Sequence, residues 1–191
     1  MNDLPQCPSE DDLDPDVRDM IACIRGHTMV TLPRLISLVQ QVRHCECLER
    51  RLHWTRGAGG TMGRLTPLTG FYDAFGGPGT LAENRNLLEQ TIQYDARNIH
   101  YHHGWFQDTL PVDAAAVGPI AILRLDGDWY ASTKACLEHL YDQVVPSGFV
   151  IVDDYDTYDG CRKAVDEFIA SRSLPVQLHR VDADCRYWVK D

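Results

Sequence analysis

Two short apolar runs in the second half of the chain constrain its fold most strongly. IAIL at residues 120–123 and FVIV at residues 149–152 are apolar at every position rather than at alternate positions, which is typical of strands that are covered on both faces. Between them, residues 132–144 have the spacing of an amphipathic helix that begins near Ser132 or Thr133. A strand, a helix and a second strand in this order predict an α/β sheet with parallel strands and a right-handed crossover.

Further elements are expected on both sides of this unit. Apolar residues at helical spacing predict helices at residues 14–24, 32–42, 81–92 and 160–171. Strands are expected at residues 68–75, 98–104, 176–181 and 185–189, and a turn at Pro146-Ser147-Gly148. Residues 45–65 have neither a helical nor a strand period.

Composition excludes several classes of function. The net charge of −10 argues against a nucleic-acid partner, because binding to phosphates depends on lysine and arginine. No apolar segment reaches the ~20 residues of a membrane span, and the acidic start of the chain is unlike a signal peptide. We therefore expect a soluble, cytoplasmic protein with no membrane partner. An odd count of 7 cysteines fits reduced thiols better than a disulfide framework.

A pair of aspartates follows each apolar run. Asp126 and Asp128 lie in LRLDGDWYAST, and Asp153 and Asp154 lie in GFVIVDDY. If the two strands are neighbours, all four carboxylates converge at the edge of the sheet where α/β proteins bind ligands. Two like charges 4 Å apart repel by about 4 kcal/mol at an effective dielectric of 20, so such a cluster needs a cation or raised pKa values. Oxygen ligands favour Mg²⁺, Mn²⁺ or Ca²⁺ over zinc.

A structural role for these aspartates is the simplest alternative, because aspartate at the end of a strand often caps a helix or forms a turn. Two pairs at adjacent strand ends favour a metal or catalytic cluster instead. A metal there can lower the pKa of a substrate hydroxyl, and a carboxylate that is not committed to the metal can accept the proton. His100, His102 and His103 lack a second ligand segment, so we read them as surface and core residues.

Several segments resemble one enzyme family. RLDGDWYAST, LEHLYDQVVPSGFVIVDDY and GCRKAVDEF resemble segments of the macrocin O-methyltransferase family, whose members methylate sugar hydroxyls on macrolides with S-adenosylmethionine and a metal ion. HGWFQDTLP is similar to the family's GWFxDTLP segment, and FYDAFGG to its DSFxG turn. HTMVTLPRLISLVQQVR and the closing RYWVKD are similar to its N-terminal helix and last strand.

The resemblance implies a fold and an activity. The fold would be a Rossmann-like class I methyltransferase sheet, α/β and mostly parallel, with a C-terminal antiparallel strand and helices on both faces. The activity would be that of an S-adenosylmethionine-dependent O-methyltransferase that uses Mg²⁺ or Mn²⁺ and acts on a hydroxyl of a sugar or sugar-bearing small molecule. Asp126, Asp153 and Asp154 would bind the metal, and Asp128 would be the general base. A homodimer is the candidate assembly.

The resemblance also implies cofactor-binding residues. Asp73 would hold the ribose hydroxyls, Gly104 and Trp105 would lie near the adenine, and Asp126 would contact the cofactor as well as the metal. The family opens its sheet with a motif like ECGVxRGGS, and LERRLHWTRGAGG stands in its place here. Gly57 and Gly59 would then supply the cofactor loop.

We therefore expect a single methyltransferase-like domain over residues 1–191. It would contain an N-terminal helical cap region at 1–44, an altered cofactor-loop region at 45–65 and an α/β core at 66–191. The altered loop also motivates an alternative, a non-catalytic relative that keeps the fold and the metal cluster as a binding or assembly module. A metal-dependent hydrolase, the third hypothesis, lacks a bridging histidine or a second set of metal ligands.

Overall fold

The computed structural model describes residues 11, 13–25, 30–47, 81–102 and 104–191. Its helices and strands, in chain order, are α1 (Pro15–Arg25), α2 (Leu32–Cys47), α4 (Leu81–Arg85), the π-helix η2 (Asn86–Thr91), the 3₁₀ helix η3 (Ala96–Asn98), α5 (Phe106–Val117), β1 (Ile120–Leu125), α6 (Tyr130–Leu140), the 3₁₀ helix η4 (Tyr141–Gln143), β2 (Val144–Val152), α7 (Asp159–Arg172), β3 (His179–Arg180) and β4 (Arg186–Val189). The strand that we expected at residues 68–75 lies outside the described residues.

The described strands form one sheet in the order β1-β2-β4-β3. β1 and β2 are parallel, with Leu125 opposite Val152, and α6 connects them. β4 is antiparallel to both β2 and β3. The predicted α/β fold with a C-terminal antiparallel strand is therefore confirmed, and the two apolar runs are neighbouring strands.

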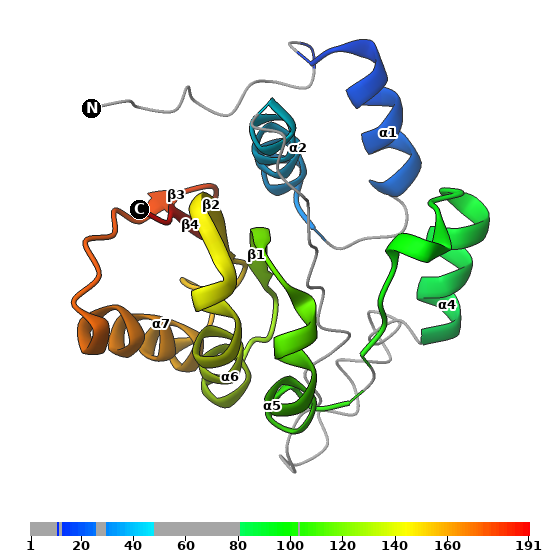
Figure 1. Ribbon diagram of the computed structural model, residues 1–191. Helices are drawn as coiled ribbons and strands as arrows, with labels where there is room; N and C mark the ends of the chain where they lie inside the picture. Colours follow the sequence, from blue (N-terminus) through cyan, green and yellow to red (C-terminus); the bar gives the residue numbers. More distant parts are fainter. Residues whose placement is uncertain (1–10, 12, 26–29, 48–80, 103) are drawn as a thin grey trace, which may run out of the picture.

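Helices cover both faces of the sheet (Figure 1). Leu123 and Val150 belong to a buried cluster that includes side chains of α5, α6 and α7. Ile122 and Ile151 belong to a second cluster, against which Leu38 of α2 packs. Neighbouring positions of β1 and β2 thus enter different apolar layers, which explains why both strands are apolar throughout.

The prediction of a turn at residues 146–148 is wrong. These residues belong to β2, in which they form a bulge. Ile120 pairs with Val144, and Ile122 pairs with Phe149, so the extra residues of β2 protrude between the two pairs. The backbone N–H of Ser147 donates to the carbonyl of Lys190, and that of Lys190 donates to Gly148, at 2.6 and 2.9 Å. These bonds keep the bulge within the sheet, where proline and glycine would otherwise indicate a turn.

Several other predicted elements differ in part. The helix expected at 132–144 is α6, which begins two residues earlier and is followed by η4, and the strand expected at 176–181 is reduced to β3. Residues 99–102 form no ladder with any described strand, so the strand expected at 98–104 is absent from that part of the structure. The helix expected at 81–92 forms, but its second half is the π-helix η2. The helices expected at 14–24, 32–42 and 160–171 are confirmed as α1, α2 and α7, with α2 extended to Cys47.

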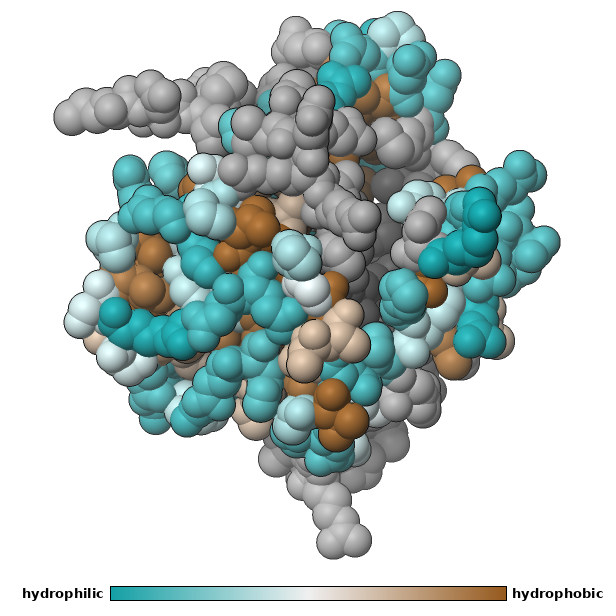
Figure 2. Space-filling view, in the orientation of Figure 1, coloured by the Kyte–Doolittle hydropathy of each residue, from teal (hydrophilic) through white to brown (hydrophobic). Residues whose placement is uncertain are grey.

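The surface of the described elements is mainly hydrophilic on the face shown in Figure 2, with small, separate hydrophobic areas. Among the described side chains, the large hydrophobic residues that are exposed are Ile92, Tyr94 and Val112. No described helix has the length and apolar character that a membrane-spanning helix needs.

Candidate functional site

The site begins where β1 and β2 end at the same level. Leu125 and Val152 are paired, and the backbone N–H of Asp153 donates to the carbonyl of Leu125 at 2.9 Å. Both predicted pairs of aspartates therefore follow the same edge of the sheet, at the carboxyl ends of its parallel strands. This is the edge at which α/β sheets bind ligands.

The structure brings three of the four carboxylates together. Asp126, Asp128 and Asp154 each offer one oxygen, and these oxygens all lie within 4.8 Å of one another. All three residues are partly buried. The ion pairs formed among the described residues reach Asp126 and Asp153, but not Asp128 or Asp154.

Burial and unbalanced negative charge raise the pKa of Asp154. Burial, followed by the charges of Asp153, Asp126 and Asp128, raises the pKa of this carboxyl to about 8. Like charges held this close disfavour ionisation of all of them at once. A divalent cation would relieve that repulsion, and a set of carboxylate oxygens is the ligand chemistry that Mg²⁺ or Mn²⁺ prefers. The residues present thus fit the metal ion that the sequence predicts.

A short loop presents Asp128 to this cluster. Asp128 has a φ of 56°, in the left-handed region that non-glycine residues seldom adopt. The hydroxyl of Ser132, in the first turn of α6, donates to the carbonyls of Gly127 and Trp129. A Cβ at Gly127 would lie only 3.1 Å from that hydroxyl, so glycine allows the close approach. The loop is therefore fixed by the helix that follows it.

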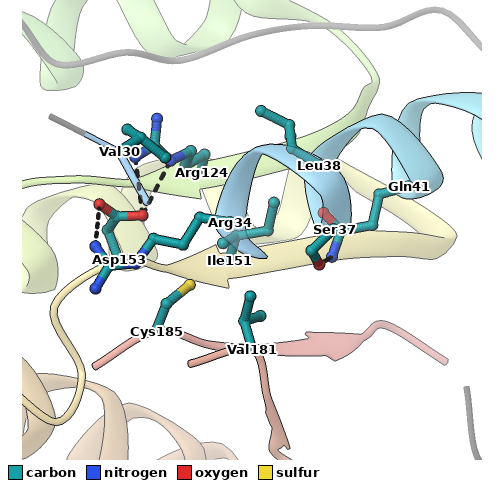
Figure 3. Close-up of a pocket in the computed structure, with 10 residues that line it drawn as sticks. All are labelled: Val30, Arg34, Ser37, Leu38, Gln41, Arg124, Ile151, Asp153, Val181 and Cys185. Atoms are coloured by element: carbon teal, nitrogen blue, oxygen red, sulfur yellow. Dashed lines mark hydrogen bonds and ion pairs between the residues drawn. The ribbon is translucent and has the colours of Figure 1, made fainter. Parts of the chain in front are cut away.

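Asp153 has a different environment from Asp154. Asp153 is only 5 % exposed and contacts two arginines. Arg34 Nη1 lies 2.9 Å from its Oδ2, and Arg124 Nη2 lies 2.8 Å from its Oδ1. Figure 3 shows Asp153 with these ion pairs, beside a cavity of about 10 Å³. That volume holds about one water molecule.

The two arginines extend the network in opposite directions. Arg124 Nη2 also lies 3.3 Å from Asp126 Oδ2. Arg34 reaches Asp182 at 2.7 Å and Asp184 at 3.1 Å, in the connection between β3 and β4. Burial alone would lower the pKa of both guanidinium groups, but these carboxylates outweigh it and raise both pKa values. Both arginines therefore remain charged.

The predicted cofactor residues are only partly described. Gly57, Gly59 and Asp73 lie outside the described residues. Gly104 has a φ of 150°, and a Cβ there would lie 2.8 Å from Thr109 Cγ2, so the position requires glycine. Trp105 immediately precedes α5, and its carbonyl accepts from the hydroxyl of Thr109 at 3.0 Å. A tight turn therefore starts α5, and its role toward a cofactor stays a prediction.

Four cysteines of the core form no disulfide. Cys45, Cys136, Cys161 and Cys185 are all buried and unbridged. Burial raises the pKa of Cys136 to about 12 and that of Cys161, which is also surrounded by aspartates, to about 12. Since the thiolate is the reactive form, these thiols are unsuited to nucleophilic catalysis.

Our reading of the sequence missed Arg34 and Arg124, although both leave a signal there. Arg124 interrupts an otherwise apolar strand, and arginine is almost never buried without a partner. Arg34 lies one helical turn before Leu38 and shares its face of α2 with Cys45, which is buried against the sheet. In each case a charged residue at an otherwise apolar position indicates a buried partner of opposite charge.

Comparisons with known proteins agree on one family. Residues 86–190 match the family model described as macrocin-O-methyltransferase (TylF). Demethyldecarbamoylnovobiocin O-methyltransferase of Streptomyces niveus is 36% identical over 128 residues, which are 61% of this chain and 48% of that protein. Mycinamicin III 3''-O-methyltransferase of Micromonospora griseorubida is 37% identical over 90 residues, 47% of this chain and 34% of that protein.

A solved structure extends the similarity beyond the matched segment. The O-methyltransferase NovP superimposes with a TM-score of 0.58 and 25% sequence identity, covering 92% of this chain and 78% of that one. In sequence, the chain spans about half the length, or less, of the curated relatives that it matches.

Proposed function

This chain belongs to the macrocin O-methyltransferase family, and we propose that it is an S-adenosylmethionine- and Mg²⁺-dependent O-methyltransferase. Its acceptor would be a hydroxyl of a sugar or of a sugar-bearing small molecule, as the names of its relatives suggest. The observation that carries the proposal is the group of three carboxylates at the ends of β1 and β2. It supplies oxygen ligands and a base at the edge of the sheet where a substrate would bind.

The proposed mechanism divides the work among the aspartates. Asp126 and Asp154 would hold the metal ion, and Asp128 would accept the proton of the acceptor hydroxyl as its oxygen attacks the methyl group. When bound, S-adenosylmethionine supplies an activated methyl group and Mg²⁺ lowers the pKa of the hydroxyl. The fixed loop around Asp128 supports its role, since a base must be held within hydrogen-bonding reach of the proton.

Asp153 is the third metal ligand that the family resemblance implies. Its contacts with Arg34 and Arg124 support an indirect contribution, because Arg124 also contacts Asp126. Gly104 and Trp105 are proposed to line the cofactor site together with Asp73, Gly57 and Gly59.

Transfer of a labelled methyl group tests the proposal directly. The purified chain would be incubated with methyl-tritiated S-adenosylmethionine, with Mg²⁺ or EDTA, and with demethylated sugar-bearing antibiotics as acceptors. We expect label in the acceptor only when Mg²⁺ is present. Calorimetry that detects no binding of S-adenosylmethionine or its demethylated product, with or without Mg²⁺, would contradict the proposal.

A second function is favoured by the altered segment at 45–65, where LERRLHWTRGAGG replaces the family's cofactor motif. The chain would then be a non-catalytic module that keeps the fold and binds the metal. Thermal melting separates the two, because only ligands that bind the folded state raise the melting temperature. A shift with Mg²⁺ but none with S-adenosylmethionine favours the non-catalytic module, and a shift with both favours the enzyme.

A further inference from the structure

We propose that Arg34 and Arg124 are positioning residues that clamp Asp153 and thereby hold Asp126 and Asp154 in place for a divalent cation. The inference rests on the cation site of the proposed function. It assigns part of that site to α2, which lies outside residues 86–190, the segment that the family model matches.

Each carboxylate oxygen of Asp153 has its own arginine. Oδ1 lies 2.8 Å from Arg124 Nη2 and accepts from Arg124 Nε at 3.2 Å. Oδ2 accepts from Arg34 Nη1 at 2.9 Å. The side chain of Asp153 is 7% exposed, and those of the arginines are 11% and 12% exposed. A carboxylate held from both sides in a buried setting has one orientation, which also fixes the backbone at the end of β2.

Arg124 connects the ends of the two strands. It belongs to β1, yet it contacts Asp153 after β2 and Asp126 after its own strand. Asp154 immediately follows Asp153, so a backbone that is fixed at Asp153 also restricts the position of Asp154. A single guanidinium group therefore links the ends of β1 and β2, where the proposed ligands Asp126 and Asp154 lie. A metal site must fix the separation of such ligands to within a few tenths of an ångström.

Arg34 is itself anchored before it reaches Asp153. Asp182 Oδ2 accepts from Arg34 Nε at 2.7 Å and from the Thr31 hydroxyl at 2.7 Å. Asp182 Oδ1 in turn accepts from the backbone N–H groups of Asp184 and Cys185. The β3–β4 connection thus fixes Arg34. Arg34 in turn contacts Asp153, as Figure 3 shows.

A role in positioning and a role in charge balance predict opposite effects. If the arginines only offset negative charge, removing one would strengthen the attraction of the site for a cation. If they position the carboxylates, removing one would weaken binding, as substitutions of residues behind metal ligands do by about 10–100-fold. Replacement by lysine also distinguishes the two roles, because lysine keeps the positive charge but lacks the planar guanidinium group. Binding should stay unchanged if only charge matters and weaken if geometry matters.

The experiment measures Mn²⁺ binding to the full chain by calorimetry and by electron paramagnetic resonance, without S-adenosylmethionine or acceptor. Arg34→Lys, Arg124→Lys and the corresponding methionine variants are compared with the unchanged chain. We expect all four to bind Mn²⁺ about 10-fold or more weakly, in the range for residues behind metal ligands, with an altered Mn²⁺ spectrum. Where a methionine variant fails to fold by circular dichroism, its lysine counterpart decides.

Arg172 provides the matched control. It pairs with Asp142 just before β2, at the opposite end of the strand from the site, so Arg172→Lys and Arg172→Met should leave Mn²⁺ binding unchanged. Unchanged binding by the Arg34 and Arg124 lysine variants, or tighter binding by their methionine variants, would overturn the clamp alone. Failure of the unchanged chain to bind Mn²⁺ would overturn the metal assignment of the proposed function and the clamp with it.

Discussion

Arg34 Nη1 lies 2.9 Å from Asp153 Oδ2, although the two residues are 119 positions apart in the sequence. The contact joins the N-terminal helix α2 to the end of the central strand β2. It also places a cation beside Asp153, the one aspartate of the four that is not part of the group of Asp126, Asp128 and Asp154. Two arginines therefore hold Asp153, and one of them, Arg124, also contacts Asp126 of the neighbouring carboxylate group.

Asp128→Asn should abolish most methyl transfer. The amide cannot accept the proton of the acceptor hydroxyl, and loss of a general base typically costs about 10²–10⁴-fold in rate. The measurement is the initial rate of label transfer at saturating S-adenosylmethionine. Asp113→Asn is the matched control, because Asp113 pairs with His102 at the surface, and its rate should stay unchanged. A fully active Asp128→Asn variant would remove Asp128 from this role.

The stability of the metal-free protein should fall as pH rises because of Asp154. Burial and the neighbouring carboxylates raise its pKa from 3.8 to about 8, so the folded state holds this proton more tightly than the unfolded state does. Its contribution is fully present below about pH 4 and is lost as the pH rises through about 8. Melting temperatures in EDTA should show this decline, and Mg²⁺ should reduce it.

Asp154→Asn isolates that contribution, since an amide does not titrate. The melting temperature of the variant in EDTA should therefore fall less with rising pH than that of the unchanged chain. Mg²⁺ should also stabilise the variant less. Identical pH profiles for the two proteins in EDTA would show that Asp154 does not carry the raised pKa.

Asp182→Ala should destabilise the fold at neutral pH by about 2–3 kcal/mol, because it removes the charged acceptor of Arg34 and Thr31. Burial opposes ionisation of Asp182, but the hydrogen bonds from Arg34, Thr31 and two backbone N–H groups together outweigh it and lower the pKa of Asp182. Its contribution is thus present above its unfolded pKa and lost as the pH falls through the lowered value. Urea unfolding at pH 7 and pH 3 measures both effects.

Asp95→Ala is the control for Asp182→Ala. Asp95 pairs with Arg97 two residues away, on the surface, and surface pairs contribute little to stability. Its side chain also caps η3 by accepting from the backbone N–H of Arg97, so its unfolding curve should shift slightly, and by less than that of Asp182→Ala. If the unfolding curve of Asp182→Ala shifts no more than that of Asp95→Ala, contacts other than Asp182 hold Arg34 in place.

Asp128→Gly should stabilise the protein while abolishing activity. Asp128 has a φ of 56°, and this left-handed conformation costs a non-glycine residue roughly 1–2 kcal/mol. Glycine relieves that strain and removes one like charge, although it also gains entropy when unfolded, so we expect a net gain of about 1 kcal/mol by chemical denaturation.

Ser173→Gly separates strain from function. Ser173 has a φ of 51° at the end of α7, where glycine is the preferred residue, and it lies far from the carboxylates in sequence. This variant should gain similar stability and keep full activity. An unstabilised Asp128→Gly beside a stabilised Ser173→Gly would show that contacts of the aspartate offset its backbone strain.

The strands at the centre of the site could be predicted because their sequence pattern reports burial directly. Apolar residues at every position of 120–123 and 149–152 required cover on both faces, and the structure supplies it from α2 and from α5–α7. The aspartates at their ends were then placed by the topology of the sheet alone. The register of the two strands brings these aspartates to the same level, since Leu125 pairs with Val152.

The division between Asp153 and Asp154 was harder to predict, because it depends on partners far away in the chain. The sequence indicates that both residues follow the strand, but not which side chains each one contacts. Arg34 comes from a helix whose apolar pattern reports a core rather than a charge network. The bulge at 146–148 could not be predicted either, because proline and glycine commonly mark turns. The backbone hydrogen bonds between these residues and Lys190 reveal that they belong to the strand.

The bulge in β2 makes the two ends of that strand unequal in their tolerance of length variation. Residues inserted or removed between Val144 and Phe149 would change only how far the bulge protrudes, because pairing resumes at Phe149. One residue inserted or removed between Phe149 and Asp153 would instead shift the pairing of β2 with β1 and displace Asp153 and Asp154 relative to Asp126. Homologous enzymes should therefore vary in length at the start of this strand and stay uniform at its end, and a designer who shortens the protein should cut at the bulge.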